Sequence, residues 1–226
     1  MSALARGPAG SGGRLPRGRH GLPREAVTDS QRARILAAMI EVVAARGYTD
    51  TRVVDVIGTA GVSRKTFYEL FDSKEDCFLA AYDILLARAL EEAEAGFTRQ
   101  PAVAWPERIE AGLRAVLAHL AEHPEEARFA LVEVLAAGPK ALARRDAALR
   151  QFTGFIETGR SESTVDLPGS TAQTIAGGIA ELLYSEVLHG AAARLPARLP
   201  ELVFLIVLPF LGADRAAEER DRARVA

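Results

Sequence analysis

A short polar and cationic stretch stands out in this 226-residue sequence because its residue types fit one kind of chemistry. Ser63, Arg64, Lys65 and Thr66 follow directly after a glycine-containing break. A helix that enters the major groove of DNA needs long or hydrogen-bonding side chains at its start, and these four residues supply them. Arg64 and Lys65 could donate to guanine O6 and N7 or simply to phosphates. The stretch therefore predicts the start of a DNA-reading helix.

Residues suited to phosphate contact lie on both sides of this stretch. Phosphates are bound by helix N-terminal amides and by nearby hydroxyl or cationic groups, and Thr51, Arg52, Tyr68 and Lys74 fit those roles. The formal net charge of −2 is unevenly spread: residues 1–75 have 12 Lys and Arg against 8 Asp and Glu, whereas residues 76–226 have 16 against 22. A positive front on a negative body suits an N-terminal part that meets a polyanion.

The elements that would position these residues are three helices. Apolar residues recur at helical spacing from about residue 28 to the break at Gly47, and a short second helix is predicted from an N-cap at Thr51 to about residue 60. Ser63 should cap a third helix that runs to Phe71, and the capping-box spacing of Ser73 and Asp76 predicts the start of a fourth. The pattern predicts a helix-turn-helix over roughly residues 51–71. The alternative is an ordinary three-helix piece of a larger bundle.

The third helix has one apolar side and one polar side. On a helical wheel Phe67, Leu70 and Phe71 fall together, while Lys65 and Glu69 point away from them. The apolar side would bury the helix against its neighbours. The polar side would remain free for a partner.

The composition predicts an all-α protein. Ala and Leu dominate, aromatic residues make up 6%, and alternating β-branched runs are scarce. Further helices are predicted at about residues 104–121, 124–137, 139–158, 170–193 and 197–211. The expected organisation is a disordered basic leader over 1–26, a helix-turn-helix domain over 27–74, a larger helical domain over 75–214, and a frayed tail over 215–226. The leader is either a variable segment or an arm that contacts DNA.

The sequence resembles the TetR family of transcriptional regulators. The resemblance covers about residues 30–85 and is carried by Gly47-Tyr48-Thr49, Ala60-Gly61-Val62-Ser63, Thr66-Phe67-Tyr68-Glu69-Leu70-Phe71 and Ser73-Lys74-Glu75. It implies an all-α homodimer with an N-terminal DNA-binding domain and a larger effector-binding and dimerisation domain. It also implies that Tyr68 and Lys74 hold phosphates while the start of the third helix reads bases. Ile57 and Gly58 depart from the family pattern and could shift the angle between the second and third helices.

The last long helices are the candidates for dimerisation. One helix-turn-helix reads few base pairs, so two copies are expected, and the family resemblance places the interface on the last two helices. The candidate interface residues are Ile175, Ile179, Leu183, Val187, Leu202, Ile206 and Phe210. The alternative is that these stripes form the core of a single chain.

An effector cavity in the larger domain is a weaker inference. Aromatic residues with an occasional polar group are typical of such cavities, and each of these residues could equally be plain core. The candidates are Trp105, Phe129, Glu133, Phe152, Phe155 and Tyr184.

Several other classes of protein are disfavoured. The sequence has no nucleophile elbow, P-loop, dinucleotide-binding turn or HExxH motif, its four histidines lack metal-ligand spacing, and the single cysteine, Cys77, excludes an intrachain disulfide. We expect no enzyme activity, metal or cofactor, no membrane association, and a cytoplasmic location. The expected partners are double-stranded operator DNA, a second copy of the chain and an unknown small-molecule effector. A ligand-released repressor is the leading reading, and an activator, a ligand-independent regulator or an interaction module without DNA binding remain open.

Overall fold

A computed structural model describes residues 24–99 and 103–225, and every regular element in these residues is a helix. The α-helices are α1 (Arg24–Arg46), α2 (Val53–Ala60), α3 (Arg64–Leu70), α4 (Lys74–Thr98), α5 (Trp105–Glu122), α6 (Pro124–Leu131), α7 (Pro139–Glu157), α8 (Thr171–Leu188) and α9 (Leu199–Val225). Three 3₁₀-helices connect them: η1 (Glu133–Ala136), η2 (Thr158–Glu162) and η3 (Ala192–Arg198). The predicted all-α fold is confirmed.

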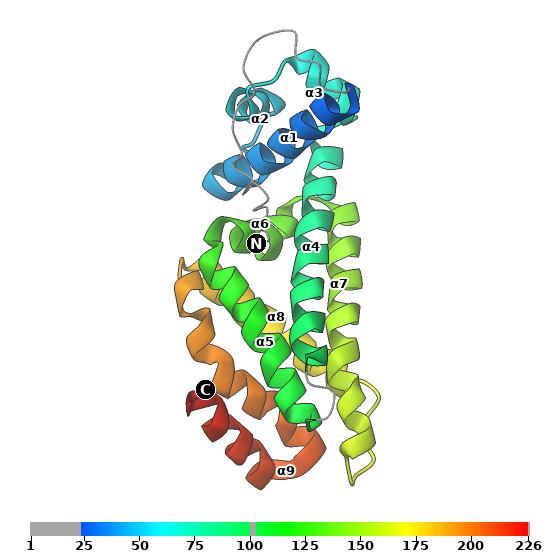
Figure 1. Ribbon diagram of the computed structural model, residues 1–226, viewed down its shortest axis with the longest axis vertical. Coiled ribbons are helices and arrows are strands. Elements are labelled where there is room, and N and C mark those ends of the chain that lie inside the picture. The colour runs from blue at the N-terminus through cyan, green and yellow to red at the C-terminus, as the bar shows by residue number, and fades with distance from the viewer. Residues whose placement is uncertain (1–23, 100–102, 226) are drawn as a thin grey trace, which may run out of the picture.

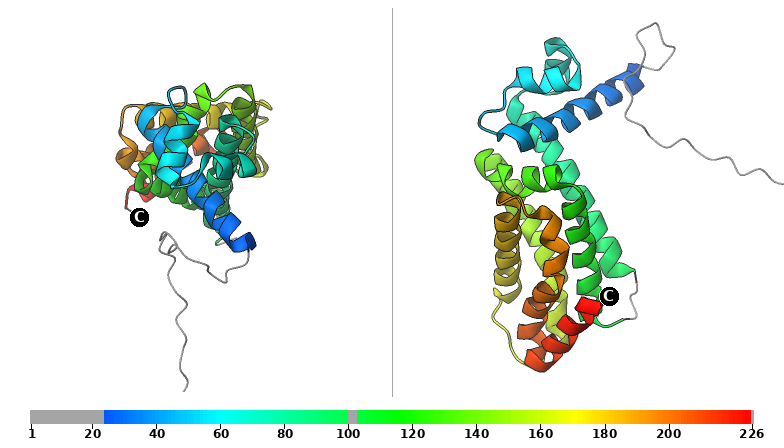
Figure 2. Two further views of the ribbon diagram at one scale, coloured as in Figure 1. Left: turned by 90° about the horizontal axis from the view of Figure 1, so that it is seen from above. Right: turned by 90° about the vertical axis from the view of Figure 1, so that its left-hand side faces the viewer.

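The molecule is elongated, with the first three helices at one end (Figure 1). α1 lies between the body and the pair formed by α2 and α3, as a second direction of view also shows (Figure 2). α1 contacts α4 and α6 on its body side and α2 on the other. α2 and α3 therefore occupy the outer end of the molecule, away from α5 to α9.

The N-terminal boundaries differ slightly from the prediction. α1 begins at Arg24 and not at Thr28, and α2 is capped by Arg52 and not by Thr51. The predicted N-caps at Ser63 and Ser73 are confirmed, because each side-chain oxygen accepts a hydrogen bond from the backbone N–H three residues later. The predicted leader lies outside the described residues except for its last three.

The prediction of a frayed tail over 215–226 is wrong for the described residues, which are helical as far as Val225. The chain bends at Gly212, whose φ of 82° is readily adopted only by glycine. Beyond the bend Ala216, Glu219 and Ala223 are buried. Because these small and acidic residues lack a long apolar stripe, the sequence pattern did not reveal that this segment packs against the body.

α4 and α5 approach each other closely at two glycines. A Cβ atom on Gly96 would lie 2.6 Å from the carbonyl oxygen of Ala111, and one on Gly112 would lie 2.9 Å from the carbonyl oxygen of Ala93. The contacts are with backbone atoms, which have little room to move. Glycine at these two positions is therefore what lets the two helices of the body touch.

The described chain has two hydrophobic clusters, and they do not divide at the predicted boundary of 74 and 75. The first joins α1, α2 and α3 to α4 as far as Leu85, and it also takes in Phe129, Val134 and Ala141 from the body. The second lies among α5, α8 and α9. The N-terminal helices therefore share their core with the body.

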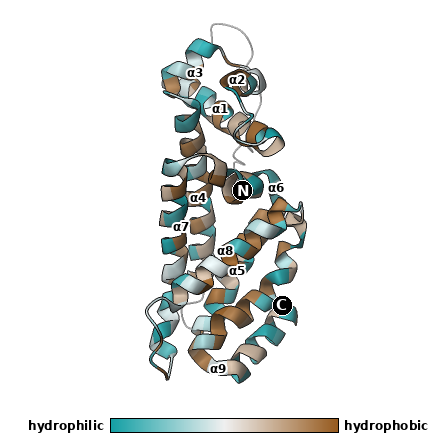
Figure 3. Cartoon of the chain, turned by 180° about the vertical axis from the view of Figure 1, so that it is seen from behind, coloured by the Kyte–Doolittle hydropathy of each residue, from teal (hydrophilic) through white to brown (hydrophobic). Residues whose placement is uncertain are grey.

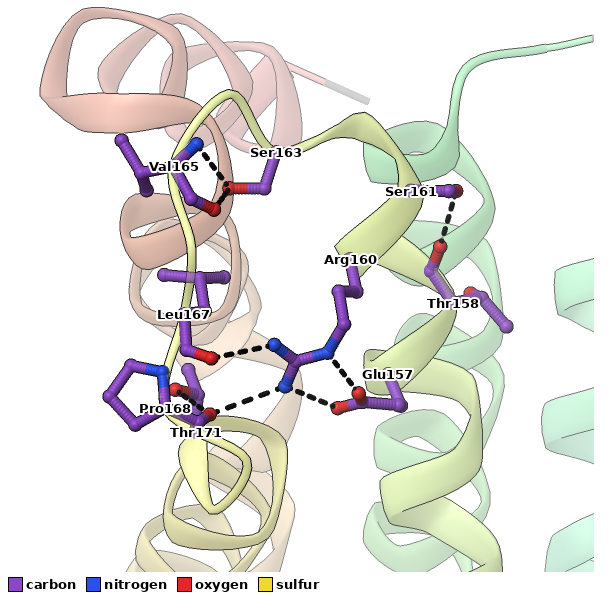
Figure 4. Close-up of polar contacts among 9 residues, drawn as sticks. All are labelled: Glu157, Thr158, Arg160, Ser161, Ser163, Val165, Leu167, Pro168 and Thr171. Atoms are coloured by element: carbon purple, nitrogen blue, oxygen red, sulfur yellow. Dashed lines mark hydrogen bonds and ion pairs between the residues drawn. The ribbon is translucent and has the colours of Figure 1, made fainter.

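A single arginine fixes the connection between α7 and α8 (Figure 4). The Arg160 guanidinium donates to the carbonyl oxygens of Leu167 and Pro168, at 2.8 and 3.2 Å, and to the carboxylate of Glu157. These bonds tie η2 to the residues that lead into α8. The connection between α7 and α8 is thereby held in place at the end of the body away from α3.

Among the described residues, one helical stretch, residues 192–225, is long and apolar enough to cross a membrane by length and composition. Its hydrophobic residues colour much of α9 brown (Figure 3). Leu202, Val203 and Ile206 are buried in the core of this chain, and Gly212 bends the helix. Core helices meet the same length and composition test, so the stretch is weak evidence for a membrane span.

The close approach of α4 and α5 makes a stability prediction. Gly112→Ala should lower the free energy of unfolding by ~1–3 kcal/mol because the added methyl group overlaps backbone atoms. Gly154→Ala in α7, where a Cβ meets nothing within 4 Å, should instead stabilise by up to ~1 kcal/mol. Urea unfolding followed by circular dichroism measures both, and equal midpoints for the two variants would contradict the packing described here.

Candidate nucleic-acid interface and ligand cavity

The turn between α2 and α3 is built on backbone geometry. Gly61 adopts φ 64° and ψ 38°, and its N–H and that of Val62 donate to the carbonyl oxygens of Gly58 and Ile57. This is the left-handed glycine ending that terminates many helices. The two residues that depart from the family pattern are thus the acceptors of the turn, and neither disrupts it.

Ser63 fixes the start of α3. Its Oγ accepts from Thr66 N at 3.0 Å and lies 2.9 Å from Thr66 Oγ1. Phe67 is fully buried beneath the helix, whereas Arg64 and Lys65 are exposed. The helix is held by its apolar side, and its first turn presents two cations to the outside.

Two further exposed groups flank this surface. Tyr68 stands edge-on to the Phe67 ring at 5.3 Å, and the Arg64 guanidinium carbon is 5.6 Å from the Tyr68 ring centroid. Arg52 is exposed at the start of α2, where its N–H donates to Asp55 Oδ2 at 2.9 Å. We call the exposed side chains of Arg52, Ser63, Arg64, Lys65 and Tyr68, with half-buried Thr66, the α3 face.

Sequence reasoning missed Val54, which is 62% exposed on α2 next to the α3 face. A β-branched residue between Val53 and Val56 is expected from the sequence pattern to be a core residue. Its position in a short helix with only one buried side is what exposes it. An exposed apolar side chain at this place is available for van der Waals contact with a partner.

Thr51 does not have the predicted phosphate-binding geometry. Its side chain is 1% exposed, and its hydroxyl donates to the Gly47 carbonyl oxygen at 2.8 Å. The sequence pattern predicted Thr51 at a helix N-terminus, where hydroxyl groups often bind anions. Here the hydroxyl instead closes the turn between α1 and α2.

The Lys74 side chain forms hydrogen bonds within its own chain. Its Nζ donates to the carbonyl oxygens of Tyr48 and Thr51, at 2.8 and 2.9 Å, and lies 4.1 Å from the centroid of the Tyr48 ring. Partial burial lowers the pKa of the Lys74 ammonium from its usual value. Two of its three N–H donors are therefore used to hold the turn that carries α2.

Glu133 holds the same turn from the body side. Its Oε2 accepts from the Tyr48 backbone N–H at 2.9 Å, and its Oε1 lies 3.1 Å from Arg128 Nη2. The side chain is buried. Glu133 was predicted to bind the ligand, but it lies at the start of η1 against the Gly47–Tyr48 turn and does not line the cavity.

Phe129 is also outside the cavity. Its ring stacks on that of Phe78 at 4.3 Å, in the cluster shared with the N-terminal helices. The aromatic residue thus serves to attach α6 to α4. The prediction that Phe129 contacts the ligand is wrong in this geometry.

An apolar cavity of about 200 Å³ lies between α4, α5, α6, α7 and α8. Three of the predicted ligand residues, Phe152, Phe155 and Tyr184, line it. Trp105 does not, because its indole packs against Phe210 at 4.9 Å and donates to the Phe155 carbonyl oxygen. Tyr82 and Arg145 also line the cavity. Sequence reasoning missed both, because a single polar residue on a mostly apolar helix face is not distinguishable from a core or surface residue by its spacing.

Most of the predicted dimerisation residues are buried in their own chain. Leu183, Val187, Leu202, Ile206 and Phe210 are buried in the second cluster, and Ile175 and Ile179 pack against it. Because these apolar stripes face inward, the buried side chains leave little surface for a partner, and their place in an interface stays a prediction. The outer faces of α8 and α9 instead present Gly177, Gly178, Leu188 and Leu205.

Comparison with known proteins finds relatives of the N-terminal helices and of the fold. Residues 35–81 match the family model described as "Bacterial regulatory proteins, tetR family". The chain is 33% identical over 128 residues to the HTH-type transcriptional regulator EthR of Mycolicibacterium smegmatis. The alignment covers 56% of this chain and 57% of that protein, so it spans little more than half of the relative.

Solved structures share the fold at low identity. The fatty acid degradation regulator FadR from Bacillus halodurans has a TM-score of 0.70 at 18% identity, covering 80% of this chain and 97% of its own. FadR from Bacillus subtilis in complex with stearoyl-CoA has a TM-score of 0.67 at 20% identity, covering 78% and 97%. A gamma-butyrolactone receptor described as ArpA-like has a TM-score of 0.65 at 18% identity, covering 88% and 98%.

The hydrogen bond between Glu133 and Tyr48 makes a second stability prediction. Glu133→Ala should lower the free energy of unfolding by ~1–3 kcal/mol, since it leaves the Tyr48 N–H without its acceptor and Arg128 without its partner. Glu125→Ala, an exposed glutamate on α6, serves as the matched control and should change stability by under ~0.5 kcal/mol. Unfolding in urea measures both, and a Glu133→Ala midpoint equal to that of the control would show that the bond contributes nothing.

Proposed function

We propose that the chain is a regulator of the TetR family of bacterial regulatory proteins, and that it is a homodimeric transcriptional repressor that a small apolar or amphipathic ligand releases from a palindromic operator. The observation that carries the proposal is the α3 face. The short helix α3 stands at the outer end of the molecule (Figure 2). Its first turn has two exposed cations, Arg64 and Lys65, and its Phe67 is buried.

The α3 face divides into two roles. Arg64, Lys65 and Thr66 lie in the first turn of α3, which is the part of a recognition helix that reaches base edges. Arg52, Ser63 and Tyr68 lie around it and supply the hydroxyl and cationic groups that bind phosphates. Lys74 supports the face indirectly, because it holds the Gly47–Tyr48 turn in place.

Two copies of this face are needed for tight binding to a palindrome, with half-sites about one helical turn apart. The outer faces of α8 and α9 are the surfaces we propose for the dimer. A Cβ atom on Gly177 or Gly178 would meet nothing within 4 Å in this chain, and Leu188 and Leu205 are exposed. Exposed glycines beside exposed leucines suit the close approach of a second copy.

Ligand release would act through elements that meet both the cavity and the N-terminal helices. Tyr82 and Leu85 of α4 and Leu131 of α6 line the cavity. α6 continues into Glu133, which accepts from Tyr48 N. A ligand that fits the cavity only after α4 or α6 has shifted would favour states in which the two α3 faces are wrongly spaced for DNA, and operator affinity would fall by linkage.

A transcriptional activator or a ligand-independent regulator would use the same α3 face and is the second candidate. Reporter expression with and without the gene separates these roles. All of these functions place the protein in the cytoplasm with DNA and require no cofactor. Footprinting of the DNA around its own gene would identify the operator, and the lack of preference for any duplex over random competitor would overturn the whole proposal.

Arg64 gives the DNA-binding test. Arg64→Ala should weaken binding to the footprinted operator by ~1–3 kcal/mol and relax the preference at one base position, if Arg64 reads a base. Arg150→Ala, an exposed arginine on α7 far from α3, is the matched control and should leave operator affinity unchanged. Fluorescence anisotropy over a range of salt concentrations measures both. Wild-type affinity and specificity for Arg64→Ala would show that the start of α3 does not read the operator.

Leu205 gives the test of the dimer. Leu205 is 44% exposed on α9, and Leu205→Arg should convert the dimer to monomers, because a charge would be buried without a partner at the proposed interface. Leu142→Arg on α7, where the leucine is 37% exposed, is the matched control and should stay dimeric. Sedimentation equilibrium at micromolar concentration measures both. A monomeric wild type, or a dimeric Leu205→Arg, would place the interface elsewhere or remove it.

A further inference from the structure

We propose that the cavity binds a molecule with a long alkyl chain and an anionic head, and that Arg145 and Tyr82 hold the head at the end of the cavity nearest the N-terminal helices. The inference rests on the proposed function only in treating this cavity as the effector site. It adds the chemical class of the ligand and the direction in which the ligand lies.

Residues that line the cavity extend along two parallel helices. α4 and α7 run side by side in the same direction (Figure 1). Arg144 Nε and Asp83 Oδ1 are 2.7 Å apart near one end, and the rings of Phe97 and Phe155 are 5.1 Å apart near the other. The cavity-lining part of α4 runs from Tyr82 to Phe97, which at 1.5 Å per residue is about 22 Å. A wall of that length can accommodate an extended alkyl chain along α4.

Most of the wall is hydrophobic. Leucine, isoleucine, valine, alanine and phenylalanine side chains supply nearly all of it, and a ligand that filled the cavity would gain the free energy of burying its own apolar surface. Among the lining residues the polar side chains are those of Tyr82, Arg145 and Tyr184. A ligand with polar groups along its length would leave them without hydrogen-bond partners.

The cationic end of the cavity lies at Arg145. Arg145 and Tyr82 come from facing positions of α7 and α4, and they interact electrostatically. Among the described residues, the one carboxylate within 4 Å of the Arg145 guanidinium is that of its chain neighbour Asp146, at 3.7 Å, which is longer than a hydrogen bond. Arg145 therefore has hydrogen-bond donors free for an anion.

Tyr82 can donate a second hydrogen bond to the same anion. Its side chain is 5% exposed, and no hydrogen bond joins its hydroxyl to another described residue. Burial raises the pKa of Tyr82 to about 12, so the hydroxyl stays protonated at neutral pH and acts as a donor. An anion between Arg145 and Tyr82 would accept a charge-assisted hydrogen bond from each.

The balance of interactions favours an anionic head over a neutral or cationic one. The Arg145 side chain is 30% exposed, so its guanidinium beside the apolar wall gains somewhat more from a counter-ion than it would in water. A neutral hydroxyl would recover only part of that gain, and a cation would be repelled. Free fatty acids and fatty acyl thioesters of coenzyme A share the required chemistry.

The test is calorimetric titration of the full chain with sodium dodecanoate, dodecan-1-ol and dodecanoyl-CoA. Dodecanoate should bind the wild type at least tenfold more tightly than dodecanol, which has the same chain length and a neutral head. Arg145→Gln should weaken dodecanoate about tenfold and leave dodecanol unchanged, while Arg145→Lys should retain part of the preference. Arg150→Gln on the same helix is the matched control and should match the wild type. Tyr82→Phe should reduce the preference for dodecanoate to a lesser extent.

The two possible sources of the head are separated by the third ligand. If dodecanoate binds tightly, the head is the carboxylate of a free acid; if only dodecanoyl-CoA binds and Arg145→Gln weakens it, the head belongs to the coenzyme. Measurable but equal affinities for dodecanoate and dodecanol in the wild type, the absence of binding by all three ligands, or an Arg145→Gln variant with wild-type affinity for the ligand that binds would overturn the inference.

Operator binding of the ligand-free wild type, measured in parallel, separates this inference from the proposed function. Failure of ligand selectivity with an intact operator preference would overturn the ligand class alone. Loss of operator preference would overturn the proposed function, while the direct affinities would still decide which ligand the cavity binds.

Discussion

The turn at Gly47 and Tyr48 is the constraint on which the N-terminal helices depend. Lys74 Nζ donates to the Tyr48 carbonyl oxygen, and Glu133 accepts from the Tyr48 N–H, so one peptide segment is held by α4 on one side and by η1 on the other. Gly47 makes this possible: its φ of 84° favours glycine, and a Cβ atom there would lie 3.4 Å from Glu133 Oε2. Because α2 begins five residues after Tyr48, the same two bonds set where α2 and α3 stand relative to the body.

A scaffold of this kind is necessary because α3 cannot be stable alone. A helix of 7 residues is far shorter than the ~12–15 residues at which isolated helices become even marginally stable in water. Its stability comes from the Ser63 cap and from burial of Phe67 in the shared cluster. Because the helix is held by its cap and by Phe67, its first turn does not need to pack against the protein. Arg64 and Lys65 can therefore both be exposed there. Exposure of that turn is therefore a consequence of how its opposite side is anchored.

The helix caps and breaks could be predicted from sequence because they depend on local chemistry. Which element each buried helix face packs against could not be predicted. Ser63, Ser73 and Gly61 act within three residues of themselves, so the sequence pattern located them correctly. The stripe containing Leu202 and Ile206 was correctly read as buried, but periodicity does not say whether a helix packs on its own chain or on a second one. Lys74 and Glu133 meet Tyr48 across 26 and 85 residues, and a sequence without related sequences beside it holds no signal for such contacts.

The shared core bears on how a ligand could affect DNA binding. Tyr82 and Leu85 belong to the hydrophobic cluster of the N-terminal helices and also line the cavity. Any ligand that changes the position of these side chains changes the packing of α4 against α1 directly, so coupling needs no chain of intermediate residues. Close-packed cores move between discrete arrangements more readily than they deform continuously. If the proposed ligand binds this cavity, the two sites would be coupled through one set of side chains, and the strength of that coupling would depend on how differently the ligand contacts Tyr82 in the two arrangements.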